Sequence, residues 1–110
     1  MNITPFQHRV YEALMRVPAG RVTTYGLLAR HLGCGSPRAV GQALRRNPFA
    51  PRVPCHRVIA SDLTLGGFNG CRTGAEPARK RALLAREGVP FDAAGRLADP
   101  RRIFRFGTQK

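Results

Sequence analysis

Two residue pairs in the sequence, Thr4-Pro5 and Ser36-Pro37, each place a helix-capping side chain directly before a proline. Proline is favoured at the first position of a helix, because its fixed φ angle suits the helix and its missing N–H would have no helical partner there. After the first pair, apolar residues recur at helical spacing as far as Pro18. They are Phe6, Val10, Ala13, Leu14 and Val17. The two pairs therefore predict where two helices begin.

A short helix is expected between these two. Thr23 or Thr24 can cap residues 25–32, and Gly33 can end the helix because glycine readily adopts the left-handed conformation that follows many helices. The next helix is predicted over about residues 37–46, where an Asn-Pro pair stops it. Two short helices joined by a tight glycine-containing turn are typical of a helix-turn-helix.

The helix over residues 37–46 has two distinct faces when its residues are placed about 100° apart. Its apolar side carries Val40, Ala43 and Leu44, and its polar side carries Arg38, Gln42 and Arg45, with Gly41 beside them. A face of arginine and amide groups suits a nucleic-acid groove, and a neighbouring glycine lets the backbone approach closely. A solvated helix surface is the alternative explanation.

The second half of the chain is predicted to contain one more helix and several short extended segments. A glycine-rich loop, "GGFNG", precedes a helix that begins at Glu76-Pro77 and ends at Gly88. Its core candidates are Ala82, Leu83 and Leu84. Short extended pieces then surround a turn at Ala94-Gly95. The predicted fold class is therefore mainly α with short extended segments.

At 110 residues the chain is long enough for one domain with its own core. We expect residues 1–110 to form this single domain, with residues 88–110 packed on it as a tail and no separate N-terminal domain. No apolar stretch approaches the roughly 20 residues of a membrane span, and the start lacks the apolar segment of a signal peptide. The expected protein is soluble and lies in the cytoplasm or nucleoid, or in the nucleus of a eukaryote, with no membrane partner.

Basic residues dominate the charge, because 19 Lys and Arg against 6 Asp and Glu give a formal net charge of +13. The guanidinium group donates in a planar fork that suits phosphate, and a dense basic surface attracts a polyanion regardless of its sequence. Nucleic acid is therefore the expected partner. A solubilising surface, or codon bias towards arginine in a GC-rich genome, is the alternative explanation.

Three cysteines, an odd number, argue against a disulfide framework. The sequence contains neither a C-x-x-C pair nor closely spaced histidines, so no metal site is predicted. Cys34 and Cys71 have no assigned role and are expected to be buried. The third cysteine, Cys55, is the candidate for a cysteine that acts through its free thiol group.

Cys55 lies in the segment "VPCHRVI", directly before His56 and Arg57. A base or a nearby positive charge can convert a thiol to the nucleophilic thiolate. Adjacent residues of an extended strand point to opposite faces, so a water could bridge Cys55 to His56, with Glu87 a candidate for the carboxylate that orients the imidazole. A buried, unreactive cysteine is the alternative.

Five segments of the sequence resemble, in order, the motifs of the DNA-binding and active-site domain of O6-alkylguanine-DNA alkyltransferases. They are "RVTTYGLLA", "SPRAVGQALRRNP", "VPCHRVI", "GGFNG" and "ARKRALLAREG". The resemblance covers roughly residues 4–88 and implies the winged helix-turn-helix-like fold of that domain. It also implies that the partner is double-stranded DNA containing O6-alkylguanine, and that the protein is a monomer without cofactor or metal.

The resemblance assigns the chemistry to residues at matching positions. It implies that Cys55 attacks the alkyl carbon of a flipped-out guanine and becomes irreversibly alkylated. His56, acting through a water and oriented by Glu87, is implied to take the thiol proton, and Tyr25 to assist departure of the base. Asn47 is implied to brace the helix that precedes it against the active-site segment.

Other matching residues are assigned to DNA and base binding. Arg38 is implied to fill the gap that the flipped base leaves in the duplex, and its helix to enter the minor groove. Further DNA contacts are assigned to Tyr25, Thr24, Ala39, Gly41, Gln42 and Arg45, and the base pocket to Pro54, Val58, Phe68 and Asn69.

Similar motifs occur in the small alkyltransferase-like proteins, which bind alkylated guanine and pass it to nucleotide excision repair proteins. Those proteins typically replace the acceptor cysteine, whereas this sequence keeps Cys55. A DNA repair alkyltransferase that reacts once is therefore the leading hypothesis, and a non-enzymatic lesion sensor is the second. A helix-turn-helix transcription regulator with an incidental cysteine is the third.

Overall fold

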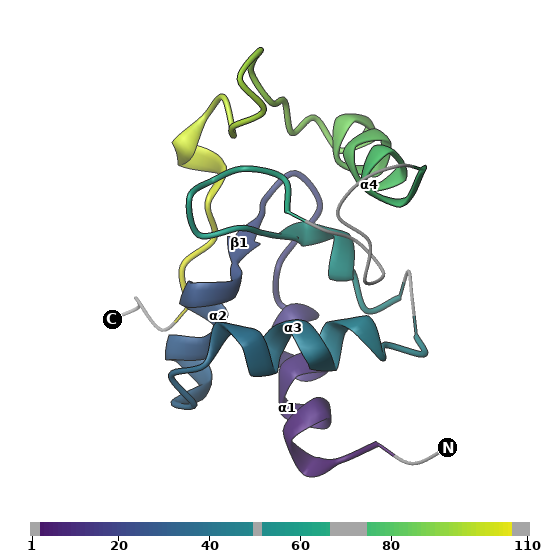
Figure 1. The fold of residues 1–110 in the computed structure, drawn as a ribbon, viewed down its shortest axis with the longest axis vertical. Helices are drawn as coiled ribbons and strands as arrows, with labels where there is room; N and C mark the ends of the chain where they lie inside the picture. Colours follow the sequence, from purple (N-terminus) through teal and green to yellow (C-terminus); the bar gives the residue numbers. More distant parts are fainter. Residues whose placement is uncertain (1–2, 50–51, 67–74, 107–110) are drawn as a thin grey trace.

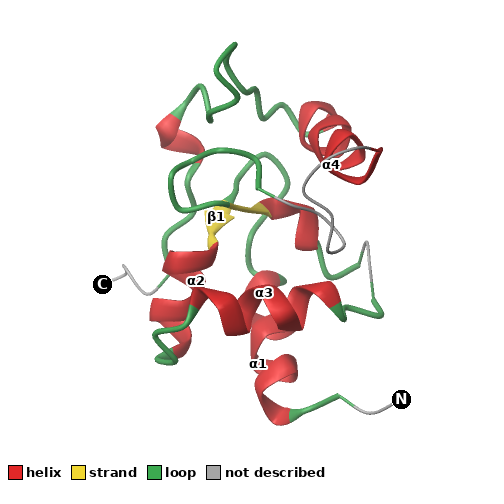
Figure 2. Cartoon of the chain, in the orientation of Figure 1, coloured by secondary structure: helices red, strands yellow, loops and turns green. Residues whose placement is uncertain are grey.

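The computed structural model describes residues 3–49, 52–66 and 75–106 (Figures 1 and 2). Its helices are α1 (Pro5–Leu14), α2 (Tyr25–Leu32), α3 (Pro37–Arg45) and α4 (Ala75–Arg86). Two strands, β1 (Thr23–Thr24) and β2 (Val58–Ile59), form a parallel sheet, and the 3-10 turns η1 and η2 cover Cys55–Arg57 and Pro100–Arg102. The described helices include none that is long and apolar enough to cross a lipid bilayer. The mainly α fold class is confirmed.

Capping residues determine where the first three helices begin. The Thr4 side chain accepts the N–H of Gln7 at 3.0 Å while the Gln7 side chain accepts the N–H of Thr4 at 3.1 Å, which is a capping box. Thr24 and Ser36 accept backbone N–H groups three residues further on, at 3.0 and 3.1 Å. Gly33 ends α2 with a φ of 71°, as its sequence position predicts.

The first three helices enclose the main hydrophobic core. Fully buried side chains at its centre are Val10 and Leu14 from α1, Leu28 from α2 and Val40 from α3. Burial of each such side chain contributes about 1.5–3 kcal/mol. The phenol of Tyr11 donates to the carbonyl oxygen of Ala43 at 2.7 Å, which joins α1 to α3. These contacts hold the helix-turn-helix as one packed unit.

A second, smaller core involves the sheet, α4 and the C-terminal tail. Its buried members are Val22, Ile59, Leu84, Val89 and Leu97. In the sheet, Thr23 pairs with Val58 and Thr24 pairs with Ile59. The segment just before α2 therefore runs beside the segment just after η1, and the start of α2 lies next to Ser61, whose Oγ accepts the N–H of Gly26 at 3.2 Å.

The tail packs on the domain through residues 89–106. It turns at Ala94-Gly95, as predicted, and Gly95 there has a φ of 82°. Phe104 donates its N–H to the carbonyl oxygen of Val22 at 2.6 Å, and Val22 donates to the carbonyl oxygen of Arg102 at 2.9 Å. The tail is thus hydrogen-bonded to both backbone groups of Val22, the residue directly before β1.

Helix α4 turns a different face to the core from the one that its apolar residues suggest. Ala82, expected in the core, is exposed, and Leu83 is only partly buried. The buried side chains are Pro77, Lys80 and Leu84, which lie three and four residues apart. Consecutive residues point about 100° apart on a helix, so a run of three neighbouring apolar residues cannot all face one core.

Candidate active site

Cys55, His56 and Arg57 form a single 3-10 turn, where the sequence suggests an extended strand. The carbonyl oxygen of Pro54 accepts the N–H of Arg57 at 2.9 Å and closes the turn. With about three residues per turn, successive side chains point in three directions, so the expectation of two opposite faces is wrong. Cys55 and His56 are only 6% and 5% exposed. The side chains of Cys55 and His56 therefore lie inside the protein.

Glu87, directly after α4, binds both residues that follow Cys55. Its Oε2 lies 3.0 Å from Nε2 of His56, which is the contact that the sequence analysis predicts. Arg57 donates from Nε to Oε1 at 2.9 Å and from Nη2 to Oε2 at 2.7 Å. Its Nη1 donates to the carbonyl oxygen of Val17 at 2.9 Å. Arg57 thereby anchors the carboxylate to the chain that follows α1.

The Glu87 carboxylate determines the tautomer of the neutral imidazole. Burial raises the pKa of Glu87, but the hydrogen bonds from Arg57 and His56 outweigh it and hold the pKa below its ordinary value. An ionised carboxylate can only accept hydrogen bonds, so Nε2 of His56 carries the hydrogen. Nδ1 is then left as the nitrogen that can take up a proton.

The Cys55 thiol is not activated in the free protein. Burial raises its pKa above the ordinary value, while the side chain of Asn47 and the charge of Lys80 offset only part of that effect. The thiol is therefore protonated at neutral pH. Within the described part of the chain, no hydrogen bond joins Cys55 directly to His56. Proton transfer between them requires a bridging molecule such as water.

Lys80 of α4 is a functional candidate that the sequence analysis missed. Its side chain is fully buried, and its Nζ lies 5.9 Å from the centre of the Tyr25 ring. Burial lowers its pKa from 10.5 to about 8, although the neighbouring Cys55 opposes the shift. The sequence contains a signal for this position. Lys80, Leu84 and Glu87 occur at i, i+4 and i+7, which puts Lys80 on the same helical face as Leu84 and Glu87.

Tyr25, the first residue of α2, lies half-buried between two glycines. A Cβ atom at Gly41 would lie 3.9 Å from Cε1 of the ring, and one at Gly66 would lie 3.7 Å from Cε2. Gly66 also has a φ of 74°, a conformation that glycine adopts without strain. The ring therefore fits between α3 and the loop after β2, with Lys80 near it.

Asn47 connects the end of α3 to the segment that carries Cys55. Its Nδ2 donates to the carbonyl oxygen of Val53 at 3.0 Å, and its Oδ1 accepts the N–H of Phe49 at 2.9 Å. The side chain is thus placed where the resemblance implies a brace between helix and active-site segment.

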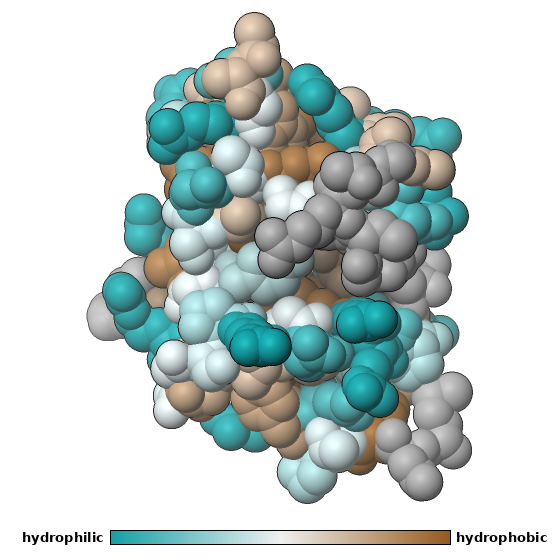
Figure 3. All heavy atoms as spheres, in the orientation of Figure 1, coloured by the Kyte–Doolittle hydropathy of each residue, from teal (hydrophilic) through white to brown (hydrophobic). Residues whose placement is uncertain are grey.

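Helix α3 presents the two faces that the sequence predicts. Arg38, Gln42 and Arg45 are exposed, Ala39 and Gly41 are half-buried, and Val40, Ala43 and Leu44 are buried. In Figure 3, hydrophilic side chains gather on the molecular face over α3. A basic surface therefore adjoins the buried Cys55 site, and Tyr25 lies at the boundary between them.

The remaining site candidates fall into three groups. Thr24 is 5% exposed and its side chain caps α2, so the structure shows it in a supporting position and not on the exposed basic face. Pro54 and Val58 flank the 3-10 turn and are buried, and the Val58 N–H donates within that turn. Phe68 and Asn69 lie outside the described residues.

Cys34 does not join this site in the structure. Cys34 is exposed in the turn between α2 and α3, which contradicts the expectation that it is buried, because that turn projects away from the core. Cys71 lies outside the described residues. Among residues 3–49, 52–66 and 75–106, no group of three or more His, Cys, Asp or Glu side chains is arranged to hold a metal ion.

Comparison with known protein families gives a match over most of the chain. A family model described as 6-O-methylguanine DNA methyltransferase, DNA binding domain, matches residues 5–89. A DNA base-flipping protein of Thermus thermophilus is 54% identical over 69 residues, which are 63% of this chain and 46% of that protein. A methylated-DNA–protein-cysteine methyltransferase of Saccharolobus islandicus is 48% identical over 85 residues, 77% of this chain and 52% of that protein. The chain thus spans about half the length of these relatives.

Two solved structures are similar in fold. S. pombe Atl1, in complex with damaged DNA containing O6-carboxymethylguanine, matches with a TM-score of 0.78 and 33% identity, over 96% of this chain and 99% of that chain. Mycobacterium tuberculosis OGT, in complex with DNA, matches with a TM-score of 0.64 and 44% identity, over 78% of this chain and 51% of that chain. The first similarity extends over almost the whole length of both chains.

Proposed function

Because this chain belongs to the family of the 6-O-methylguanine DNA methyltransferase DNA-binding domain, we propose that it binds O6-alkylguanine in double-stranded DNA and transfers the alkyl group to Cys55. The observation that carries the proposal is the hydrogen-bonded set of His56, Arg57 and Glu87 directly beside a buried cysteine. A cysteine that served only as a small hydrophobic residue would not need an oriented imidazole next to it.

The exposed face of α3 supplies the DNA contacts in this proposal. Arg45 and other exposed basic residues bind phosphates, which adds affinity with little dependence on sequence. The O6 atom of a stacked guanine cannot reach a buried thiol, so the nucleotide has to rotate out of the duplex. Arg38, exposed in the first turn of α3, then occupies the space that the base leaves.

The chemical step is a displacement at the alkyl carbon. The Cys55 sulfur forms a bond to that carbon while the bond from carbon to O6 breaks, and the electron pair stays on the guanine. The thiol proton passes through a water to Nδ1 of His56, and the ionised Glu87 stabilises the resulting imidazolium. In this proposal Tyr25, half-buried beside Lys80, assists departure of the guanine as its anion.

The raised pKa of Cys55 is consistent with this relay. A permanently charged thiolate in a buried site would carry a large desolvation cost, whereas a thiol that loses its proton only during attack avoids it. The positive charge of Lys80 favours the negative charge on the sulfur as it develops. The product is a thioether, which has no route back to the thiol, so each molecule reacts once.

Mass spectrometry of the intact protein tests the proposal directly. The protein is mixed with a duplex containing one O6-methylguanine, and the modified residue is found by peptide mapping. We expect a stoichiometric gain of one methyl group on Cys55, and no gain in Cys55→Ala, which should still bind the lesion. Methylation of Cys55→Ala, or methylation of the natural protein at another residue, would refute the assignment.

A non-enzymatic lesion sensor is the second candidate, and one observation favours it. The match to Atl1, crystallised with damaged DNA, covers 96% of this chain, whereas the match to Mycobacterium tuberculosis OGT covers 78% of it. In that case the same experiment would show tight, lesion-selective binding without a mass change. The protein would then act as a monomer that marks alkylated DNA for nucleotide excision repair proteins, in whichever compartment holds the DNA.

A further inference from the structure

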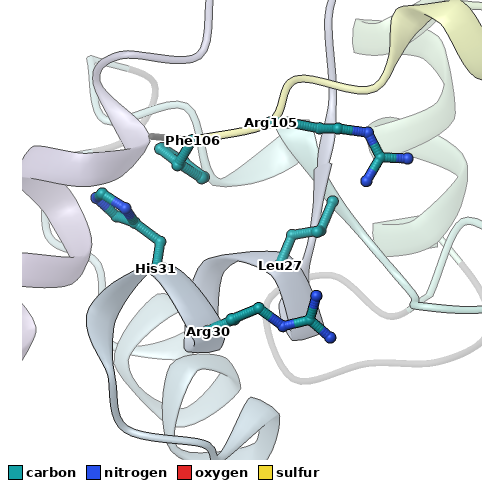
Figure 4. Close-up of a pocket in the computed structure, with 5 residues that line it drawn as sticks. All are labelled: Leu27, Arg30, His31, Arg105 and Phe106. Carbon is teal, nitrogen blue, oxygen red and sulfur yellow. The ribbon is translucent and has the colours of Figure 1, made fainter. Parts of the chain in front are cut away.

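We propose that a hollow between α2 and the C-terminal tail binds a short acidic segment of a partner protein, one that carries an aliphatic or aromatic side chain beside its carboxylates. The hollow has a volume of about 200 Å³ and is lined by Leu27, Arg30, His31, Arg105 and Phe106 (Figure 4). None of these residues belongs to α3 or to the Cys55 site. The inference therefore does not depend on alkyl transfer.

Stacked rings form one wall of the hollow. The His31 ring lies on the Phe106 ring with 4.4 Å between centroids and 19° between planes. Phe104 packs edge-on against Phe106, at 5.0 Å, and the guanidinium of Arg16 lies 5.7 Å from the Phe106 centroid. Contacts on several sides hold Phe106 in place, so the hollow is already formed in the absence of a ligand.

The two sides of the hollow differ in chemistry. Figure 4 shows the His31 and Phe106 rings on one side of the hollow and, on the other, the Leu27 side chain with the guanidinium groups of Arg105 and Arg30 above and below it. A cavity of about 150 Å³ is large enough for a benzene ring, so this hollow can accommodate one leucine or phenylalanine side chain. Carboxylates on the two sides of that residue could then each pair with one of the arginines.

The surrounding charge favours an acidic ligand. Burial lowers the pKa of His31, and the positive charges of Arg16 and Arg9 lower it further, so two more cationic side chains lie near this wall. The acidic residue of α1, Glu12, lies 3.6 Å from His8, away from the hollow. Glu12 of α1 therefore does not offset the positive charge around the hollow, and a carboxylate of the partner would offset it.

A peptide fits these features better than a DNA backbone does. The phosphodiester chain offers negative charge, but it has no compact apolar group to fill the space over Leu27 and Phe106. An acidic segment with one large apolar residue satisfies both sides of the hollow at once. Because α3 contributes nothing to the lining, the segment could bind while α3 is on DNA.

Fluorescence anisotropy with two labelled peptides, EDELDE and EDESDE, tests the proposal. They carry the same charge, so the difference between them reports the apolar contact. We expect the leucine peptide to bind at least about tenfold more tightly, since only its apolar side chain can leave water in the hollow. Equal binding of the two peptides would overturn the proposal, because it would show charge attraction alone.

Two double variants with equal loss of charge locate the site. Arg30→Ala with Arg105→Ala should weaken binding of the leucine peptide about tenfold more than Arg81→Ala with Arg86→Ala does, the latter two residues being exposed on α4. Binding of an undamaged duplex is measured in parallel. If the first pair weakens duplex binding about tenfold more than the second pair does while the two pairs bind the leucine peptide equally, the hollow belongs to the DNA surface and the proposal fails.

Discussion

Arg57 holds both carboxylate oxygens of Glu87, through Nε at 2.9 Å and Nη2 at 2.7 Å. A fork of two parallel hydrogen bonds fixes the plane of the carboxylate as well as its position. The same carboxylate contacts His56. Arg57 is therefore a positioning residue for the imidazole, although it has no place in the proton relay itself.

Replacement of Arg57 should change the pH dependence of stability. A carboxyl group whose pKa is lowered by folding stabilises the protein above its ordinary value of 4.5, and this contribution is lost as the pH falls through the lowered pKa. In Arg57→Gln the pKa of Glu87 should lie closer to 4.5, so the acid-dependent decrease of Tm should become smaller. Thermal unfolding between about pH 2.5 and pH 6 measures this.

The variant Arg57→Lys is the matched control, because it keeps the charge but not the fork. We expect its loss of stability in acid to lie between those of the natural protein and Arg57→Gln. Its alkyl-transfer rate should be about tenfold below that of the natural protein, since the imidazole would be less well oriented. An unchanged pH dependence in Arg57→Gln would show that Arg57 does not set the pKa of Glu87.

Replacement of the buried Lys80 by methionine should remove a pH-dependent gain of stability. The folded protein releases the Lys80 proton near pH 8, whereas the unfolded chain holds it up to about pH 10.5, so Lys80 makes the natural protein more stable as the pH rises between these values. The difference corresponds to about 3 kcal/mol. Urea denaturation at pH 7.5 and pH 10 should show this gain in the natural protein and a smaller one in Lys80→Met.

The same variant should react more slowly at neutral pH. Loss of the Lys80 charge raises the pKa of the Cys55 thiol further, because that charge favours the thiolate. The rate of labelling by a benzylguanine pseudosubstrate is measured as a function of pH. The pH at which this rate is half-maximal should be higher in Lys80→Met than in the natural protein. A labelling profile identical to that of the natural protein would contradict a role for Lys80 beside the thiol.

Arg38→Ala should separate DNA opening from chemistry. If Arg38 fills the gap left by the flipped base, transfer from duplex DNA should slow by about tenfold or more, while reaction with a free benzylguanine base, which needs no flipping, should be unchanged. Arg81→Ala, on the exposed surface of α4, is the control for loss of one positive charge. Equal losses on both substrates would argue against the proposed role of Arg38.

Thr23→Val should stabilise the protein. The Thr23 side chain is fully buried in β1, and its hydroxyl oxygen has no hydrogen-bond partner among the described residues. Valine has nearly the same shape without the unpaired polar group, so a gain of about 1 kcal/mol in unfolding free energy is expected. Urea denaturation measures it, with Thr23→Ser as a control that keeps the hydroxyl. A loss of stability in Thr23→Val would show that the hydroxyl is satisfied after all.

Local signals in the sequence determined the helices and the division of α3 into two faces. Thr4 and Ser36 cap helices through bonds to residues only three positions away, and Gly33 ends α2 through its own backbone conformation. Such contacts depend on neighbours along the chain, so a linear pattern is sufficient to predict them. The contact between His56 and Glu87 is predicted by the resemblance to the alkyltransferases, with Glu87 a candidate from the sequence alone.

Only the tertiary structure decided the electrostatic environment of the thiol. The bonds from Arg57 to Glu87 join residues 30 positions apart, and Lys80 meets Tyr25 because of the face that α4 turns to the core. That face depends on packing against the sheet and tail, which places Leu84 inward and leaves the apolar Ala82 exposed. Burial, and with it the pKa values of Cys55 and Lys80, is a property of all the surrounding atoms together, which is why no single stretch of sequence contains it.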